Sequence, residues 1–319
     1  MRNLCFIDWH SFPNIRWTRI KFIRSYIRIS AVDTNMDIHY QEILLHKTLT
    51  VDDRKKDLEK LKKWNALTNE RKFCGNPFLY HHQLKNLLET RIGNRLLLRE
   101  VCQDKEQYDK LLASVEQRNR TGTLANRVFE CYRVNQGSCV FFKASTAKFI
   151  YQKYKCSHVL DFTAGWGGRM LGAWALGIAY TEIDTNESLK PAYKDMLQDL
   201  ENPSNICMIW DSCLNVDLSK IDYDFVLTSP PYYNLELYEH MKPFASKQAF
   251  YGSFLINMIN RCRQNIKRNG KVAINISPSM YKELLSYGYE PCAEEHNLLQ
   301  QKRKGVDKCD KIYIWTFTK

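Results

Sequence analysis

The sequence lacks the features that would place the protein in a membrane or around a structural metal. No apolar run reaches about 18 residues, so no membrane-spanning segment is expected. The basic, aromatic residues 1–30 contain no continuous apolar segment of the kind found in signal peptides. They form either a basic arm or an extension ahead of a start at Met36. The 11 cysteines are odd in number and include no CxxC pair, which favours reduced thiols in an intracellular protein, cytoplasmic or nuclear, and no metal site.

Charge is unevenly distributed along the chain, whose net charge is +12. Residues 1–135 carry 25 Lys and Arg against 16 Asp and Glu, a net +9, whereas residues 136–319 carry 22 against 19, a net +3. A basic excess of this size favours a polyanionic partner such as DNA or RNA. A basic protein with no nucleic-acid role can have the same balance, so charge alone leaves both readings open.

The first part of the chain has helical periodicity. Within residues 51–65, Leu58, Leu61 and Trp64 recur at i, i+3 and i+6, which predicts a charged helix with a narrow apolar stripe. The lysines between them are typical of a solvated face.

The turn Gly75-Asn76-Pro77 separates this helix from a second expected helical stretch, His82 to Glu106.

We expect two domains. Residues 1–135 form a mostly helical basic region for nucleic-acid or target recognition, and residues 136–319 form a second domain.

In the second domain the pattern changes to alternating strands and helices. This alternation predicts a parallel sheet with helices on both faces, closed by an antiparallel C-terminal strand in a hairpin. Strands are expected at 158–161, 179–183, 206–210, 225–227, 271–276 and 311–317, and helices at 149–154, 169–176, 189–200, 250–266 and 281–287.

The first predicted strand leads into a glycine-rich turn, residues 161–168 (DFTAGWGG). Glycines allow a tight turn and let the backbone approach a ligand. Because the turn reads neither GxGxxG nor GK[ST], it is neither a dinucleotide fingerprint nor a phosphate loop. Asp161 can accept a hydrogen bond from a cofactor ammonium, directly or through water. The turn therefore suits a nucleoside cofactor, although such a turn is weak evidence by itself.

Acidic residues also end the next two predicted strands. Asp184 ends the second, where a carboxylate can bind two ribose hydroxyls. Asp211 ends the third, beside Ser212, where it can accept a hydrogen bond from an adenine amine. Each acid could equally belong to an exposed turn or a helix cap. Acids at three successive strand ends favour the binding site.

The fourth predicted strand ends in residues 228–233 (TSPPYY). Two prolines fix the backbone, so the turn is rigid. Such a turn can aim the Ser229 side chain and the Pro230 carbonyl at one amine, while Tyr232 stacks on a flat ring. Accepting the amine protons makes its nitrogen more nucleophilic, and fixed placement supplies proximity.

The two turns together resemble the DNA amino-methyltransferases, which make N4-methylcytosine or N6-methyladenine. The resemblance covers about 136–319 and rests on DFTAGWGG and TSPPYY, in that order, with residues 142–146 (FKAST) placed where the family has a further cofactor-binding segment. It implies a class I, Rossmann-like fold, S-adenosylmethionine as cofactor, and a nucleic acid, in the first place DNA, as partner. The SPPY form leans mildly toward cytosine.

The resemblance assigns roles to residues of this sequence. The catalytic set is Ser229, Pro230, Pro231 and Tyr232; the cofactor set is Phe142, Ser145, Thr146, Asp161, Thr163, Ala164, Gly165, Gly167, Asp184, Asp211 and Ser212; and the nucleic-acid set is Tyr233, Lys302, Arg303 and Lys304. A base held in a duplex must flip out to reach such a turn.

The sequence departs from the family in one respect, because little chain follows the predicted sheet for a C-terminal recognition domain. Recognition then comes from residues 1–135, from loops such as 234–247, or from a protein partner or second copy. Three other readings stay open: methylation of adenosine in RNA, a catalytically inactive nucleic-acid-binding subunit, and methylation of a protein glutamine, which the basic charge and Ser229 disfavour.

Overall fold

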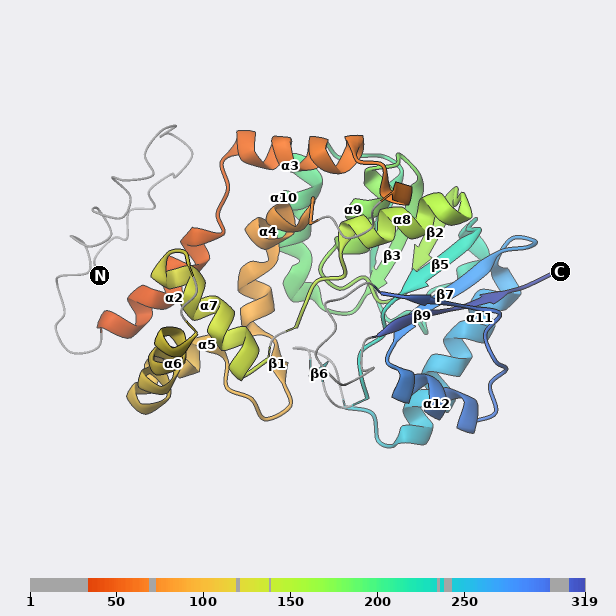
Figure 1. The fold of residues 1–319 in the computed structure, drawn as a ribbon. Helices are drawn as coiled ribbons and strands as arrows, with labels where there is room; N and C mark the ends of the chain where they lie inside the picture. Colours follow the sequence, from red (N-terminus) through yellow and green to blue (C-terminus); the bar gives the residue numbers. More distant parts are fainter. Residues whose placement is uncertain are drawn as a thin grey trace, which may run out of the picture.

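Helices fill the first part of the chain and alternate with strands in the second in the computed structural model (Figure 1). The structure describes residues 34–68, 73–118, 121–137, 139–233, 236–237, 243–298 and 310–318.

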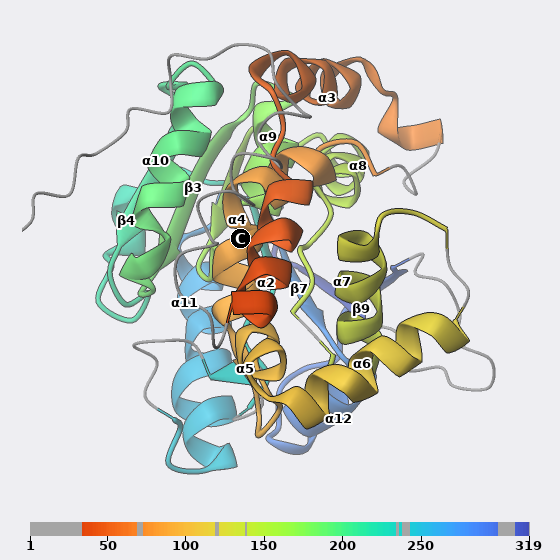
Figure 2. The same ribbon diagram turned by 90° about the vertical axis from the view of Figure 1, so that its left-hand side faces the viewer.

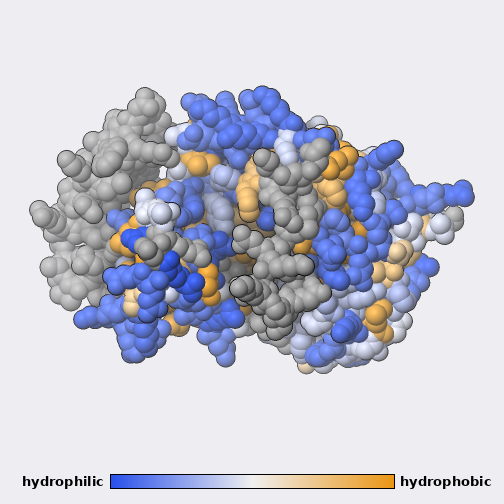
Figure 3. Space-filling view, viewed as in Figure 1, coloured by the Kyte–Doolittle hydropathy of each residue, from blue (hydrophilic) through white to orange (hydrophobic). Residues whose placement is uncertain are grey.

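The helical region begins with α2, and its helices follow one another across short turns. Its elements are α2 (Thr34–His46), α3 (Val51–Lys63), η3 (Ala66–Thr68), α4 (Asn76–Glu89), β1 (Arg91–Ile92), α5 (Leu98–Gln103), α6 (Lys105–Gln117) and α7 (Leu124–Asn135). The predicted helix at 51–65 is confirmed: Leu58 and Leu61 are buried, while most of its lysines are exposed. The surface over α3 is accordingly hydrophilic (Figure 3).

The second predicted helix, His82 to Glu106, is wrong as one unit. The helix that contains His82 ends at Glu89, and the short strand β1 and a turn interrupt the stretch before α5. The cause is non-local, because β1 pairs antiparallel with β6 (Glu236–Leu237), far away in the sequence.

The strands of the second part form a seven-stranded sheet in the order β4-β3-β2-β5-β7-β9-β8. β9 runs antiparallel between β7 and β8, and the remaining pairs are parallel. This confirms the expected fold class, an α/β, Rossmann-like sheet of mainly parallel strands with an antiparallel C-terminal strand. The elements are α8 (Ala144–Tyr154), β2 (His158–Asp161), α9 (Gly168–Trp174), β3 (Ala179–Asp184), η4 (Glu187–Leu189), α10 (Lys190–Asp199), β4 (Ile206–Trp210), η5 (Leu218–Lys220), β5 (Phe225–Thr228), η6 (Ala249–Ile256, a π-helix), α11 (Asn257–Asn265), β7 (Lys271–Ile276), α12 (Pro278–Ser286), β8 (Glu294–Asn297) and β9 (Lys311–Thr316).

Both faces of the sheet are buried, as parallel strands require. Successive residues alternate between two cores: Val159 packs on the face of α8 and α9, and Leu160 on the face of η6 and α11. The same alternation holds at the neighbouring strand, where Phe225 and Val226 face opposite ways.

The helical region and the sheet share one of these cores. A single cluster of buried residues runs from Tyr40 on α2 through α4 and α8 to Ile314 on β9. Viewed from the end that carries α2 and α4, these helices lie in front of the sheet (Figure 2). The domain boundary at residue 135 stays a prediction, and the packing across it is continuous.

A buried lysine fixes the helical region to the sheet domain. Lys148, on α8, is 2% exposed, and its ammonium donates hydrogen bonds of 2.7, 2.8 and 2.7 Å to the carbonyls of Leu61, Lys62 and Trp64. These carbonyls end α3, where the helix dipole is negative. One side chain therefore caps a helix that lies about 85 residues earlier in the chain.

No helix among the described residues is long and apolar enough to cross a membrane. Over the same residues, no group of three or more His, Cys, Asp or Glu side chains is placed to hold a metal ion.

Replacing Lys148 with Met should lower the free energy of unfolding by about 2–4 kcal/mol, because it leaves the buried α3 carbonyls without donors. Urea denaturation followed by tryptophan fluorescence measures the change. Lys56→Met is the matched control, since Lys56 is an exposed lysine on α3 itself. Equal, small losses in the two variants would show that the Lys148 contacts do not hold the two regions together.

His81 makes stability depend on pH. Its Nδ1 accepts a hydrogen bond from the Leu49 backbone N–H at 3.0 Å, which requires an unprotonated Nδ1. The pKa of His81 is lowered to about 4, chiefly by burial and then by the neighbouring His82 and Arg54, while Asp199 opposes the shift. The unfolded chain takes up this proton near its ordinary pKa of about 6.5, so the contribution is complete above that pH and is lost as the pH falls toward 4.

We expect His81→Asn to retain more of its stability between pH 6.5 and 4.5 than the parent protein, by up to about 3 kcal/mol. The Asn amide oxygen can still accept from Leu49, but it does not titrate. Urea denaturation at pH 7.5, 6.0 and 5.0 measures the difference. Parallel curves for the two proteins would contradict the assignment.

Candidate active site

The two sequence motifs follow two strands that are neighbours in the sheet, β2 and β5. From β2 the chain builds outward through β3 and β4, and then crosses to β5 and continues on the other side through β7. Open α/β sheets bind ligands where the strand order reverses in this way, at the carboxyl ends of the strands. Asp161 ends β2 and Thr228 ends β5, so both turns begin at this switch point.

Asp161 is the centre of a buried ion pair. Arg169 Nε donates to Asp161 Oδ2 at 2.5 Å, and Arg169 Nη2 lies 3.4 Å from Oδ1. The Tyr180 hydroxyl at 2.7 Å and the Thr163 backbone N–H at 3.2 Å donate to the same carboxylate. Since Asp161 is fully buried, these four donors fill its acceptor positions. Its role toward a cofactor ammonium stays a prediction, and its role here is to hold the turn.

The glycine-rich turn is held by hydrogen bonds along its backbone. Arg169 Nη2 also donates to the Ala164 carbonyl at 3.2 Å, and the Ala164 N–H donates to the Ile183 carbonyl at 3.0 Å. Gly165 and Gly167 have φ of 62° and 81°, the left-handed region that favours glycine. A Cβ on Gly165 would make only ordinary contacts, at 3.9 Å from Arg169 Nη2 and from the Thr163 carbonyl oxygen.

The segment before α8 packs directly on this turn. A Cβ on Gly168 would lie 1.9 Å from the Phe142 carbonyl oxygen, so glycine alone fits this approach. The Arg169 guanidinium lies 5.4 Å from the centre of the Phe142 ring. Ser145 and Thr146 follow on α8 and are buried. The structure thus brings Phe142 to the turn, and contact of Phe142, Ser145 and Thr146 with a cofactor stays a prediction.

Asp184 touches the turn from β3. Its carboxylate accepts hydrogen bonds from the backbone N–H groups of Gly165 at 2.8 Å and Asn186 at 2.9 Å. Burial raises the pKa of Asp184 above its ordinary value, and these two N–H bonds oppose the rise. Asp184, the residue expected to bind the cofactor ribose, is therefore also a fixed part of the turn.

Asp211 and Ser212 follow β4, the outer strand next to β3. Asp211 is exposed, and its Oδ1 accepts from the Ser212 N–H at 2.6 Å and from Asn215 Nδ2 at 3.0 Å. The Ser212 hydroxyl accepts from the Leu214 N–H at 3.3 Å. Both residues lie at the carboxyl edge as expected, while the hydrogen bonds shape their own loop.

Glu182 is a buried acid to which the sequence reasoning assigned no role. It is fully buried, and its Oε2 lies 3.3 Å from the Tyr193 hydroxyl, which also donates to the Gly165 carbonyl at 2.9 Å. Among the described residues, its Oε1 has no hydrogen-bond partner. Burial, and then the Asp161 carboxylate, raise the pKa of Glu182 well above its ordinary value. Glu182 and Asp184 lie two residues apart on one strand. This spacing in the sequence indicates that both side chains lie on the same face of the sheet.

A hydrogen bond joins the two turns. Thr163 Oγ1, in the glycine-rich turn, lies 2.5 Å from Thr228 Oγ1, at the start of the TSPPYY turn. Thr228 is fully buried, so the bond is sheltered from water. The separation of the two turns is therefore fixed by the protein itself.

Ser229 is the first partly exposed residue of the TSPPYY turn. Asn275 Nδ2, on β7, donates to Ser229 Oγ at 3.0 Å, and the Ser229 hydroxyl donates to the Asn275 backbone carbonyl at 3.4 Å. Pro230 is buried and Pro231 is partly exposed, which is consistent with a rigid turn. Asn275 has no signature in the sequence, because the sheet register alone brings β7 beside this turn.

The two tyrosines of the turn are anchored to different elements. The Tyr232 hydroxyl donates to the carboxylate of Asp310, which precedes β9. Burial raises the pKa of Asp310, and the bond from Tyr232 opposes that rise. The Tyr233 ring lies 5.9 Å from the Phe250 ring and packs on η6. Both rings remain partly exposed.

The chain after the turn reaches toward the helical region. β6, within the expected loop 234–247, pairs with β1 through Arg91 opposite Leu237 and Ile92 opposite Glu236. Figure 1 shows β6 between the helical region and the sheet. Of the expected nucleic-acid residues, Lys302, Arg303 and Lys304 lie outside the described residues.

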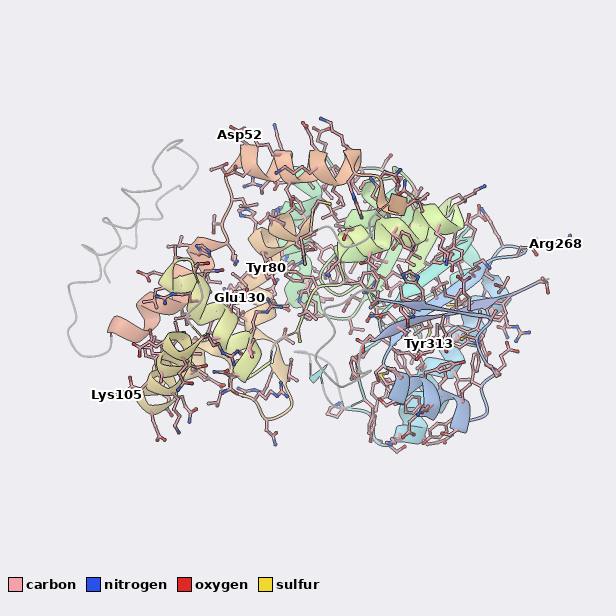
Figure 4. All side chains as sticks on the ribbon, in the orientation of Figure 1. Asp52, Tyr80, Lys105, Glu130, Arg268 and Tyr313 are labelled. Atoms are coloured by element: carbon pink, nitrogen blue, oxygen red, sulfur yellow. The ribbon has the colours of Figure 1, made fainter. Side chains whose placement is uncertain are left out.

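Aromatic rings connect the helical region to the glycine-rich turn. The ring of Tyr80, on α4, lies 4.8 Å from the ring of Phe141, which lies 6.1 Å from the ring of Trp166 in the turn. Tyr80 projects from the helical region and Tyr313 from β9 (Figure 4). The helical region therefore adjoins the end of the sheet where both turns lie.

Comparisons with known proteins return methyltransferases among solved structures. An rRNA methylase from Streptococcus thermophilus is 16% identical, with 51% of this chain and 87% of that chain covered and a TM-score of 0.36. An RNA methyltransferase from Salinibacter ruber, in complex with S-adenosyl-L-homocysteine, is 12% identical, with 56% and 95% covered and a TM-score of 0.39. A precorrin-6y C5,15-methyltransferase from Geobacter metallireducens is 13% identical, with 55% and 88% covered and a TM-score of 0.37. No family model and no curated protein matches the chain.

Proposed function

We propose that this protein transfers a methyl group from S-adenosylmethionine to an exocyclic amine of a DNA base, N4 of cytosine or N6 of adenine. The observation that carries the proposal is the junction at the switch point. A turn suited to a nucleoside cofactor and a turn suited to a planar amine are joined there by the Thr163–Thr228 hydrogen bond. That junction sets a methyl donor and a methyl acceptor at a fixed separation, which is what a direct transfer needs.

The residues present fit the cofactor. Gly165 carries no side chain and has no atom within 3.9 Å of the position of a Cβ, and the acids Asp184 and Asp211 follow in order at the ends of β3 and β4. When bound, S-adenosylmethionine supplies an electrophilic methyl group on a sulfonium centre. The protein's part is to hold the ribose at Asp184 and the adenine near Asp211.

The TSPPYY turn supports the acceptor half of the reaction. Ser229 Oγ and the Pro230 carbonyl accept hydrogen bonds from the amine, which frees the nitrogen lone pair from the ring. With the cofactor bound, its sulfonium methyl would be the group transferred to this nitrogen, Ser229 and the Pro230 carbonyl would hold the amine, and the proton lost from the nitrogen would pass to water. Tyr232, tethered to Asp310, offers its ring for stacking, worth about 1–3 kcal/mol per base.

Nucleic acid as the substrate is supported by charge and by position. Residues 1–135 carry the net charge of +9, and the described part of this region adjoins the end of the sheet that holds both turns. Phosphate contacts from such a region orient a strand without reading its sequence. The base then enters the site flipped out of the stack.

Gly165→Ala should weaken S-adenosylmethionine binding by about 10-fold or more, because the new methyl group keeps the cofactor from the backbone of the turn. Gly177→Ala is the matched control: Gly177 has φ of 67°, and a Cβ there meets nothing within 4 Å. Both variants carry a similar backbone strain of about 1–2 kcal/mol. Titration calorimetry and thermal unfolding separate the two effects, and equal affinities would remove the turn from the cofactor site.

Ser229→Ala should lower kcat by about 100-fold while leaving cofactor affinity within about twofold, because Ser229 lies on the acceptor side. Labelled methyl transfer to DNA, RNA and protein in parallel, followed by nucleoside analysis, measures it. Ser204→Ala, at an exposed serine after α10, is the control. Product should appear as N4-methylcytosine or N6-methyladenine in DNA.

The same assay discriminates the other readings. Label confined to RNA would move the substrate to adenosine in RNA, and label on protein would move it to a glutamine amide. 5-Methylcytosine would overturn the mechanism. Nucleic-acid binding without label on any acceptor would identify an inactive subunit.

A further inference from the structure

Asn275 is a buried polar residue on β7 whose side chain faces the catalytic turn. It is 8% exposed, and its Nδ2 donates to Ser229 Oγ at 3.0 Å. Within the described part of the chain, its Oδ1 has no hydrogen-bond partner. A buried acceptor without a partner costs stability, and an apolar side chain of the same size would avoid that cost. Its presence therefore calls for a role beyond packing.

The two contacts between Asn275 and Ser229 determine what the hydroxyl can do. A serine hydroxyl has one proton and two lone pairs. The proton is directed to the Asn275 backbone carbonyl, at 3.4 Å, and one lone pair receives the Nδ2–H. One lone pair is left. Toward any further group, Ser229 is thus a hydrogen-bond acceptor.

This restriction matters for an amine that must act as a nucleophile. A freely rotating hydroxyl could donate its proton to the nitrogen lone pair, which would withhold the electrons that form the new bond. A hydroxyl fixed as an acceptor instead takes an N–H bond from the amine and leaves the lone pair available. The difference lies in the direction of one proton, which Asn275 sets from both its side chain and its backbone.

We propose that Asn275 is a positioning residue that fixes the Ser229 hydroxyl as an acceptor for the substrate amine. The inference rests on the proposed function and extends it in two ways. It adds a residue from β7 to a site otherwise built from the ends of β2 to β5. It also restricts the group at Ser229 to one that carries an N–H or O–H donor.

The test is a double-mutant cycle of Asn275→Leu and Ser229→Ala. Leu has the same number of side-chain heavy atoms as Asn and the same branching at Cγ, and it makes no hydrogen bond. Kinetics give kcat and the KM for S-adenosylmethionine with the DNA acceptor, and thermal unfolding gives Tm for each variant. Thr181→Val is the matched control, because Thr181 is a buried polar residue of the same sheet, bonded to His158 at 2.9 Å.

We expect Asn275→Leu to lower kcat by about 10- to 100-fold, with the cofactor KM changed by less than about twofold and Tm unchanged or raised. In the Ser229→Ala background the same replacement should change kcat by less than about twofold, because Asn275 acts through that hydroxyl. Thr181→Val should leave kcat near that of the parent protein.

Equal kcat losses in both backgrounds would overturn the inference, as would an unchanged kcat in Asn275→Leu or a fall in its Tm of more than about 5 °C. Absence of methyl transfer by the parent protein to any acceptor would instead overturn the proposed function. The pairing is then judged from Tm alone, where strictly additive changes in the cycle would show that Asn275 does not hold Ser229.

Discussion

The architecture of the site depends on one buried ion pair, Asp161 with Arg169. Removing either partner would leave an unpaired charge in the core, at a cost of about 3–5 kcal/mol. The pair also sets the shape of the glycine-rich turn, since Arg169 reaches the Ala164 carbonyl while Thr163 bonds to Asp161. Through Thr163 the same pair fixes the position of the TSPPYY turn. A substitution of Asp161 therefore changes the structure of the turn, in addition to any effect that it has on ligand binding.

The helical region is integrated with the sheet through contacts of different kinds. Lys148 caps α3, and the side chain of Arg54 on α3 forms an ion pair with Asp199 on α10 at 2.6 Å. Gly75, at the start of α4, approaches so closely that a Cβ there would lie 3.0 Å from the Cβ of Ala144. A region connected in this way holds a fixed orientation toward the two turns.

Local patterns in the sequence predicted most of the fold, because they carry the information for each strand. The strands at 158–161, 206–210 and 271–276 have the bounds that the sequence predicted. The interruption of the predicted helix between His82 and Glu106 was missed because β1 forms only by pairing with a distant strand.

The candidate site divides in the same way. The two turns are short, contiguous motifs, so the sequence located them, and the structure brings them together at the switch point. The sequence analysis did not identify three residues at the candidate site, because their roles come from sheet register and burial: Asn275, Asp310 and Glu182. No spacing rule links Asn275 to Ser229 until β7 is paired with β5.

The core shared by the helical region and the sheet has a consequence for when the protein folds during its synthesis. The helices precede β9 in the sequence, yet their hydrophobic cluster includes Ile312 and Ile314 of β9, which are synthesised after them. The ribbon of β1 and β6 likewise joins residues made far apart in time. The helices keep apolar surface uncovered until β9 has been synthesised, so folding is cooperative and late rather than progressive during translation.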